Sequence, residues 1–324
     1  KIMADLDIVE RRKPQDGTIK FKKYGGLDIE LRVATIPTQG GVEDVVMRIL
    51  GAGETLALDK IGFSSTNYKN FVGSISQPYG LIFVCGPTGS GKTSTLHSAL
   101  SYINNPETKI WTAEDPVEIT QKGLRQVQVK PKIGFDFASA MRAFLRSDPD
   151  VIMVGEMRDR ETTTIGIEAS LTGHLVFSTL HTNSAPESIT RLLDMGMDPF
   201  NFADSILCIL AQRLVRTLCK HCKASYHPSK SEYEALVREY GSSEAFEKNV
   251  HIPYTDDLIL NKPKGCKRCY DTGYSGRTAI HELLLGTDEM KKLIQNNSPV
   301  EVIRNQAIKD GMKTLKQDGI AKIF

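Results

Sequence analysis

Short apolar segments recur along the middle of the chain, and their spacing indicates its architecture. Residues 81–85 (Leu-Ile-Phe-Val-Cys) and 151–154 (Val-Ile-Met-Val) are apolar throughout, which is typical of short strands buried on both faces of a sheet. Two further strands are predicted at residues 109–113 and 174–179. The sequence therefore predicts a buried sheet at the centre of the fold.

Helical patterns lie between these strands. They cover residues 93–102, 135–146, 161–171 and 184–195, where apolar and polar side chains separate onto opposite helix faces. Strands that alternate with helices of about 10–15 residues form parallel sheets with helices on both faces. We therefore expect an α/β core over residues 57–216.

A smaller part is predicted before the core. Residues 1–53 contain the pair Gly25-Gly26, a hairpin signal, and an alternating strand pattern at residues 27–33. We expect a small N-terminal α/β domain there, joined to the core by a flexible linker at residues 51–53 (Gly-Ala-Gly).

The region after the core holds two pairs of cysteines. Residues 217–272 contain both pairs and are predicted to form a separate segment, and residues 273–324 are predicted to form a strand followed by helices. The apolar run around Cys208 is predicted to be helical. Because the chain begins at Lys1 rather than at Met, we expect it to be part of a longer protein.

Composition narrows the class of protein. Of the 324 residues, 40% are hydrophobic and 25% are charged, which is ordinary for a globular protein. The net charge of +2 gives no electrostatic argument for binding nucleic acid or an anionic membrane. No signal peptide is recognised, and no apolar run approaches the roughly 20 residues of a membrane span.

The strongest chemical motif lies between the strand at 81–85 and the helix at 93–102. Residues 86–93 (Gly-Pro-Thr-Gly-Ser-Gly-Lys-Thr) fit the pattern G-x-x-x-x-G-K-[ST] of a phosphate-binding loop. Lys92 would reach the β- and γ-phosphates of ATP, and Thr93 would ligate Mg²⁺. The nucleotide-binding residues are therefore predicted to be Gly86, Pro87, Thr88, Gly89, Ser90, Gly91, Lys92, Thr93 and Ser94.

Candidate catalytic residues follow three strands, at the sheet edge where ligands bind. Glu156 would orient or deprotonate the attacking water, unless it only caps the next helix. Glu114 would assist with metal or water, and Asp115 either does the same or starts a turn before Pro116. His181 would contact the γ-phosphate or a neighbouring subunit, or it is structural.

The cysteine pairs Cys219/Cys222 and Cys266/Cys269 are two CxxC motifs. Each places two thiolates on one tight turn, and two such turns close a tetrahedron around Zn²⁺. His221 and His227 are possible substitutes, although four cysteines suffice. Free cysteines and nucleotide chemistry indicate a reducing compartment, the cytoplasm.

Four segments together carry a resemblance to a known family. GPTGSGKTSTL, TAEDPVE (112–118), DVIMVGEMRD (150–159) and TGHLVFSTLHTN (172–183) resemble the Walker A, Asp-box, Walker B and His-box segments of the secretion ATPase superfamily of type II and type IV secretion. The resemblance covers residues 10–324. It implies ATP hydrolysis on a RecA-like P-loop NTPase core, with an N-terminal domain that folds over the nucleotide.

The tetracysteine segment resembles the type IV pilus assembly (extension) ATPases and the type II secretion ATPases, and the sequence leaves the choice between them open. The family implies a homohexamer that acts on an inner-membrane platform protein, at the cytoplasmic face, with membrane association only through partners. It also implies nucleotide contacts for Arg32. A further segment, Gln212-Arg213-Leu214 with Arg216, resembles one that the family places near the nucleotide or the subunit boundary, with Arg213 as the candidate nucleotide contact. Where the family has a further arginine, this chain has Thr18.

Two other functions remain as alternatives. A nucleic-acid translocase on the same core would require a basic channel, which the net charge does not support, so no nucleic-acid partner is expected. A nucleotide-binding scaffold without hydrolysis is disfavoured because Lys92, Thr93 and Glu156 are intact.

Overall fold

The computed structural model describes residues 1–27, 29–50 and 55–324. These divide into a smaller unit, Lys1–Thr55 with Pro116–Lys122, and a larger unit, Leu56–Asp115 with Gly123–Phe324. The linker predicted at residues 51–53 lies outside the described residues, as does residue 28 of the strand predicted at 27–33.

The smaller unit is built on an antiparallel sheet of three strands in the order β1-β2-β3. Its elements are η1 (Ile2–Ala4), β1 (Gln15–Lys20), η2 (Phe21–Lys23), β2 (Glu30–Pro37) and β3 (Glu43–Leu50). Ala4, Ile19 and Val33 form its buried core. The predicted hairpin is confirmed, but the predicted α component is wrong here, because the described residues up to 50 form two 3-10 turns and no α-helix.

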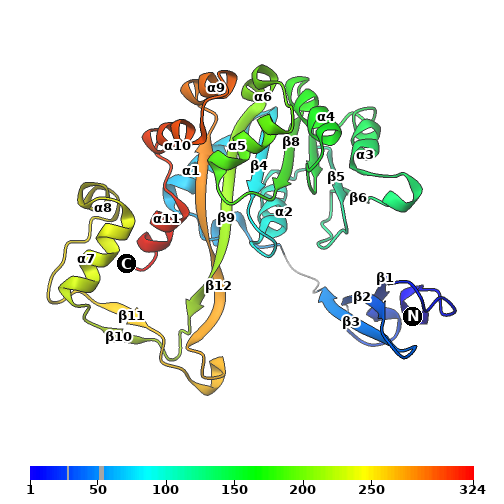
Figure 1. Ribbon diagram of the computed structural model, residues 1–324, viewed down its shortest axis with the longest axis horizontal. Helices are drawn as coiled ribbons and strands as arrows, with labels where there is room; N and C mark the ends of the chain where they lie inside the picture. Colours follow the sequence, from blue (N-terminus) through cyan, green and yellow to red (C-terminus); the bar gives the residue numbers. More distant parts are fainter. Residues whose placement is uncertain (28, 51–54) are drawn as a thin grey trace. The chain divides into compact units, whose positions relative to one another are not determined.

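The larger unit contains a seven-stranded sheet in the order β12-β9-β4-β8-β7-β5-β6 (Figure 1). Neighbouring strands are parallel except for β12, which is antiparallel to β9. The strands are β4 (Gly80–Cys85), β5 (Ile110–Glu114), β6 (Arg125–Gln128), β7 (Val151–Val154), β8 (Leu175–Leu180), β9 (Ile206–Leu218) and β12 (Tyr274–Leu285). The expected parallel core is confirmed.

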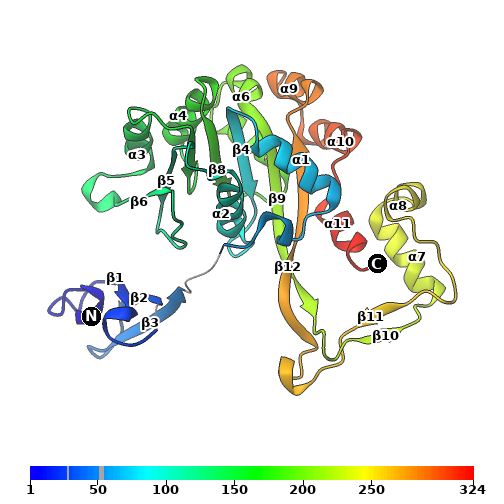
Figure 2. The ribbon, with the colours of Figure 1, turned by 180° about the vertical axis from the view of Figure 1, so that it is seen from behind.

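Helices cover both faces of this sheet, as expected (Figures 1 and 2). One face packs against η3 (Leu58–Lys60), α1 (Ser65–Ile75) and α2 (Lys92–Ile103). The other packs against α3 (Phe137–Phe144), α4 (Arg160–Leu171), α5 (Ala185–Asp194) and α6 (Pro199–Ser205). Successive side chains of β4 point to opposite faces and are all buried, which explains why the strand is apolar throughout.

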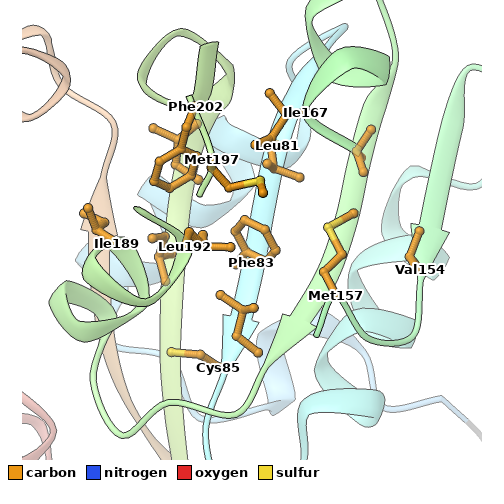
Figure 3. Close-up of a cluster of buried hydrophobic side chains, with 14 of the residues drawn as sticks. Leu81, Phe83, Cys85, Val154, Met157, Ile167, Ile189, Leu192, Met197 and Phe202 are labelled. Carbon is orange, nitrogen blue, oxygen red and sulfur yellow. The ribbon is translucent and has the colours of Figure 1, made fainter. Parts of the chain in front are cut away.

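Figure 3 shows the second of these clusters, with Leu81, Phe83 and Cys85 of β4 facing Met157 and Phe202. All five side chains are at most 1% exposed. This packing fixes the position of β4 along its strand axis relative to the neighbouring strands. It thereby fixes the position of the loop that follows Cys85.

The run around Cys208 is a strand, so the predicted helix is wrong. It begins β9, which pairs with β12 from Cys208–Leu285 to Leu218–Tyr274. Because both faces of β9 are covered at its start, its apolar residues show no alternation that would distinguish a strand from a buried helix.

The remaining elements belong to the cysteine-containing segment and the C-terminus. They are η4 (Pro131–Ile133), β10 (Ala224–Tyr226), α7 (Lys230–Tyr240), α8 (Ser243–Val250), β11 (Leu260–Lys262), η5 (Lys267–Cys269), α9 (Asp288–Gln295), α10 (Val300–Lys309) and α11 (Leu315–Ala321). Strands β10 and β11 form a separate two-stranded sheet. Among the described residues, none of the helices has the length and hydropathy required to cross a membrane.

Candidate nucleotide site and metal centre

The predicted phosphate-binding loop connects the end of β4 to the start of α2. Gly91 caps α2 without a side-chain hydrogen bond, whereas Asp136, Asp159 and Ser184 cap α3, α4 and α5 through their side chains. The first N–H groups of α2 are therefore left for another acceptor, and a helix start of this kind favours an anion such as phosphate. Thr93 and Ser94 lie in that first turn.

Two glycines of the loop are required by close packing. Gly86 has φ 151° and Gly91 has φ 88°, values that favour glycine. A Cβ atom on Gly86 would lie 2.4 Å from the carbonyl oxygen of Gln212, and one on Gly91 would lie 2.8 Å from Gln212 Nε2. The loop is thus pressed against β9, while Pro87, Thr88 and Gly89 form its exposed tip.

Lys92 is folded into the loop. Its Nζ donates hydrogen bonds to the carbonyl oxygens of Gly86 at 2.8 Å and Pro87 at 3.2 Å. Burial lowers the pKa of Lys92, and the nearby Cys85 and Glu156 oppose that shift. A partly desolvated ammonium group at this position gains from an anionic partner, as phosphate binding would provide.

Gln212 supports the same loop. It belongs to the segment at residues 212–216 that the resemblance placed near the nucleotide or the subunit boundary, but no role was predicted for its side chain. This side chain is buried, donates from Nε2 to the Ser90 carbonyl oxygen at 2.7 Å, and accepts from Thr95 Oγ1 at 2.7 Å. One side chain of β9 therefore joins the loop to α2. The signal in the sequence is an amide directly after the apolar run at residues 206–211.

Glu156 and His181 lie next to each other after β7 and β8. Glu156 Oε1 is 3.8 Å from His181 Nε2, and the two side chains are 28% and 48% exposed. They line a hollow of about 90 Å³ together with Arg158, Thr182 and Arg191. The exposed carboxylate and imidazole can therefore act on a small polar ligand or a water molecule.

The helix-capping alternative for Glu156 does not hold. Asp159 caps α4, since its Oδ1 accepts from the Thr162 N–H at 2.8 Å. Glu156 is left facing His181. Arg213 of β9 reaches the loop that follows β8 and carries His181. Its Nη2 donates to Asn183 Oδ1 in this loop at 3.1 Å.

Glu114 is placed differently from Glu156. It is 3% exposed, and its carboxylate bonds to His97 at 3.1 Å, Thr112 at 2.6 Å and Gln126 at 3.1 Å. Burial pushes the pKa of Glu114 upward, but these hydrogen bonds outweigh burial and leave the pKa below its ordinary value. Its geometry favours holding α2, β5 and β6 together, and its catalytic role stays a prediction. Glu118, the last residue of the TAEDPVE segment, is exposed.

Arg32 lies on β2 of the smaller unit and has a partner of the same charge. The pairing of β2 with β3 sets Arg32 directly opposite Arg48, so both guanidinium groups lie on one face of the sheet. Arg48 was also missed by the sequence prediction, because the register of the two strands makes it a neighbour of Arg32.

The four predicted metal ligands come together. The sulfur atoms of Cys219, Cys222, Cys266 and Cys269 all lie within 4.8 Å of one another. Backbone N–H groups of Cys266 and Gly273 donate to Cys269 Sγ at 3.2 and 3.3 Å, a contact that favours a thiolate. Four thiolates at these distances fit a tetrahedral Zn²⁺ site. Neither His221 nor His227 belongs to this cluster.

Comparison with known families identifies the chain. A family model described as type II/IV secretion system protein matches residues 1–324. The chain belongs to this family. Membership confirms the resemblance carried by the four sequence segments.

Curated relatives of the chain include ATPases of type IV pilus assembly and of type II secretion. The chain is 46% identical over 325 residues to the type IV pilus assembly ATPase PilB of Myxococcus xanthus, covering all of the chain and 55% of that protein. It is 45% identical over 324 residues to the type II secretion system ATPase E of Vibrio cholerae, again over all of the chain and 61% of that protein. The chain thus spans little more than half the length of these relatives.

Two solved structures have a similar fold. The pilus retraction motor PilT with bound ADP matches with a TM-score of 0.63 and 26% identity, over 96% of this chain and 78% of that one. The ATPase DotB of Legionella pneumophila matches with a TM-score of 0.66 and 22% identity, over 96% of this chain and 73% of that one.

Proposed function

We propose that this chain is the motor part of a hexameric ATPase that hydrolyses ATP to drive type IV pilus assembly through an inner-membrane platform protein. The observation that carries the proposal is the uncapped start of α2, which follows a glycine loop and begins with the buried Lys92. The names of the relatives, pilus assembly ATPase and type II secretion ATPase, support the choice of ATP and of the machine.

In this proposal we assign a role to each residue of the site. Lys92 and the first N–H groups of α2 bind the phosphates, and Thr93 would hold Mg²⁺, which neutralises charge between the β- and γ-phosphates. Glu156 orients the attacking water and accepts its proton, and His181 lies within reach of Glu156 to sense the γ-phosphate. Arg32 would contact the nucleotide, as the family resemblance implies, and Arg213 keeps the loop after β8 in place.

The Cys219, Cys222, Cys266 and Cys269 cluster would hold one Zn²⁺ that stabilises the segment and takes no part in hydrolysis, because four protein ligands leave no open position. We place the motor at the cytoplasmic face of the inner membrane, held there by its partners.

Type II secretion is the second candidate, because its ATPase E is nearly as similar to this chain as PilB is. A nucleic-acid translocase has no observation in its favour. Expression of the full-length protein in strains that lack either the pilus ATPase or the secretion ATPase separates the first two. Restored pili with no restored secretion support the proposal, and the reverse result assigns the chain to type II secretion.

The chemistry is tested by two substitutions. Glu156→Gln should bind ATP and lose hydrolysis by at least about a hundredfold, whereas Lys92→Ala should lose binding. Turnover at the wild-type rate in Glu156→Gln would show that another acid, with Glu114 and Glu118 as the next candidates, activates the water.

A further inference from the structure

A buried carboxylate on β12 lies against the loop that carries His181. Glu282 is 2% exposed, and its Oε1 accepts a hydrogen bond of 2.8 Å from the N–H of Ala185, the first residue of α5. Burial raises the pKa of Glu282, and hydrogen bonds from the N–H groups of Ala185 and Leu315 oppose the rise. A buried carboxylate is costly unless its donors are held in place, so Glu282 constrains the starts of two helices.

The first of these helices continues directly from the His181 loop, which we define as residues 181–184. The loop is anchored within the larger unit, since Thr182 Oγ1 lies 2.6 Å from Ser188 Oγ. Its last carbonyl oxygen, that of Ser184, accepts from Cys85 Sγ at 3.7 Å. Cys85 is the last residue of β4, so the His181 loop touches the strand from which the phosphate-binding loop begins.

The second helix belongs to the C-terminal region. Leu315 is the first residue of α11, and α11 is fastened to β12 because Asp318 accepts from the His281 N–H at 2.8 Å. A positive charge on Arg304 of α10 also acts on Glu282. One carboxylate therefore bonds to the start of α5 and interacts with Leu315 of α11 and Arg304 of α10.

We infer that Glu282 is a positioning residue, whose carboxylate holds the start of α5, and with it the His181 loop, in a fixed relation to α10 and α11. Displacement of these C-terminal helices is then transmitted to His181, and a change at His181 is transmitted to them. The inference rests on the proposed function only in taking His181 to act during ATP hydrolysis.

The test uses the full-length protein with Glu282→Ala and Glu282→Gln. In Glu282→Ala, amide hydrogen exchange in residues 181–190 of the nucleotide-free protein should become about tenfold faster, because the Ala185 N–H loses its acceptor. The kcat for ATP should fall about tenfold while KM stays within about twofold, since His181 is misplaced and the phosphate-binding loop is not.

Glu282→Gln keeps a carbonyl oxygen for Ala185 and removes the negative charge that interacts with Arg304. Its exchange at residues 181–190 should stay near that of the wild type, and its kcat should fall about threefold. Asp136→Ala is the matched control. It removes a carboxylate that accepts from the Ser139 N–H at the start of α3 at 2.9 Å, so it should lower the melting temperature and leave kcat unchanged.

Two results would overturn the inference. One is unchanged amide exchange at residues 181–190 in Glu282→Ala. If the alanine variant does not fold, the corresponding result is Glu282→Gln with both the exchange at residues 181–190 and the kcat of the wild type. The other is an equal loss of kcat in Asp136→Ala at a matched melting temperature. An inactive wild type contradicts the proposed function instead, and the exchange experiment still decides whether Glu282 holds the His181 loop.

Discussion

Arg32 and Arg48 are paired directly across β2 and β3, with no acid between them in the strand register. Like charges in this arrangement repel and destabilise a sheet by roughly 0.2–1 kcal/mol. An anion that bridged the two guanidinium groups would offset this repulsion. The pair therefore adds Arg48 to the residues expected to contact the phosphates of ATP.

Arg48→Thr should weaken binding of a non-hydrolysable ATP analogue about as much as Arg32→Ala, by roughly 1–3 kcal/mol each. It should also stabilise the ligand-free protein by about 0.5 kcal/mol at low salt, because the repulsion is removed. Calorimetry and urea denaturation measure the two effects. Arg12→Ala, which removes an exposed arginine bound to Glu10, serves as the control and should leave affinity unchanged.

Gln212→Leu tests the support beneath the phosphate-binding loop. The substitution keeps the volume but removes the bonds to Ser90 and Thr95, which should cost about 1–3 kcal/mol of stability and raise KM for ATP several-fold. The matched change Gln306→Leu in α10 should lower stability without affecting KM. An unchanged KM in Gln212→Leu would mean that the loop keeps its shape without this side chain.

The buried carboxylate of Glu114 should make the stability of the protein depend on pH. Its pKa in the folded state is lowered from the ordinary value of 4.5, so its contribution to stability is complete above that pH and is lost as the pH falls through the folded pKa. Glu114→Gln should lower the free energy of unfolding by about 1–3 kcal/mol at pH 7. The difference from the wild type should shrink on acidification below pH 4.5. Urea denaturation from pH 7 to pH 3 checks this, and the exposed Glu118→Gln should show no such trend.

Metal content tests the four-cysteine cluster. The purified protein should contain about one Zn²⁺ per chain by elemental analysis. Replacing Cys219 and Cys222 with serine should remove it and lower the melting temperature by several degrees, because metal binding contributes to folding. Cys208→Ala, at a buried cysteine outside the cluster, should keep the metal. Zinc-free protein prepared without chelators would contradict the assignment.

The nucleotide loop and the parallel core could be predicted because their signals are local. A glycine loop between an apolar strand and a helix, as at residues 86–93, needs no distant residue to be recognised. The CxxC motifs are equally local, and spacing alone indicated that their sulfur atoms would meet.

Features that depend on distant partners could not be predicted. The segment at Cys208 is a strand because it pairs with β12, whose residues follow far along the chain, and nothing in the apolar run itself identifies that partner. Gln212 reaches the phosphate-binding loop only through the parallel pairing of β9 with β4. Glu114 turns inward because His97 of α2 lies beneath it, a contact that depends on helix packing.

Strands β9 and β12 continue as a two-stranded ribbon beyond the point where β9 stops pairing with β4. The pairing of β9 with β4 ends at Ala211, and β9 itself ends at Leu218. At about 3.4 Å per residue, the part of β9 beyond β4 is roughly 24 Å long. At its far end, the Cys219 N–H donates to the Gly273 carbonyl oxygen at 2.9 Å. A tilt of about 5° where this part begins moves its far end by on the order of 2 Å. The four cysteines then matter for stiffness, because fraying at the end of the ribbon would reduce this displacement.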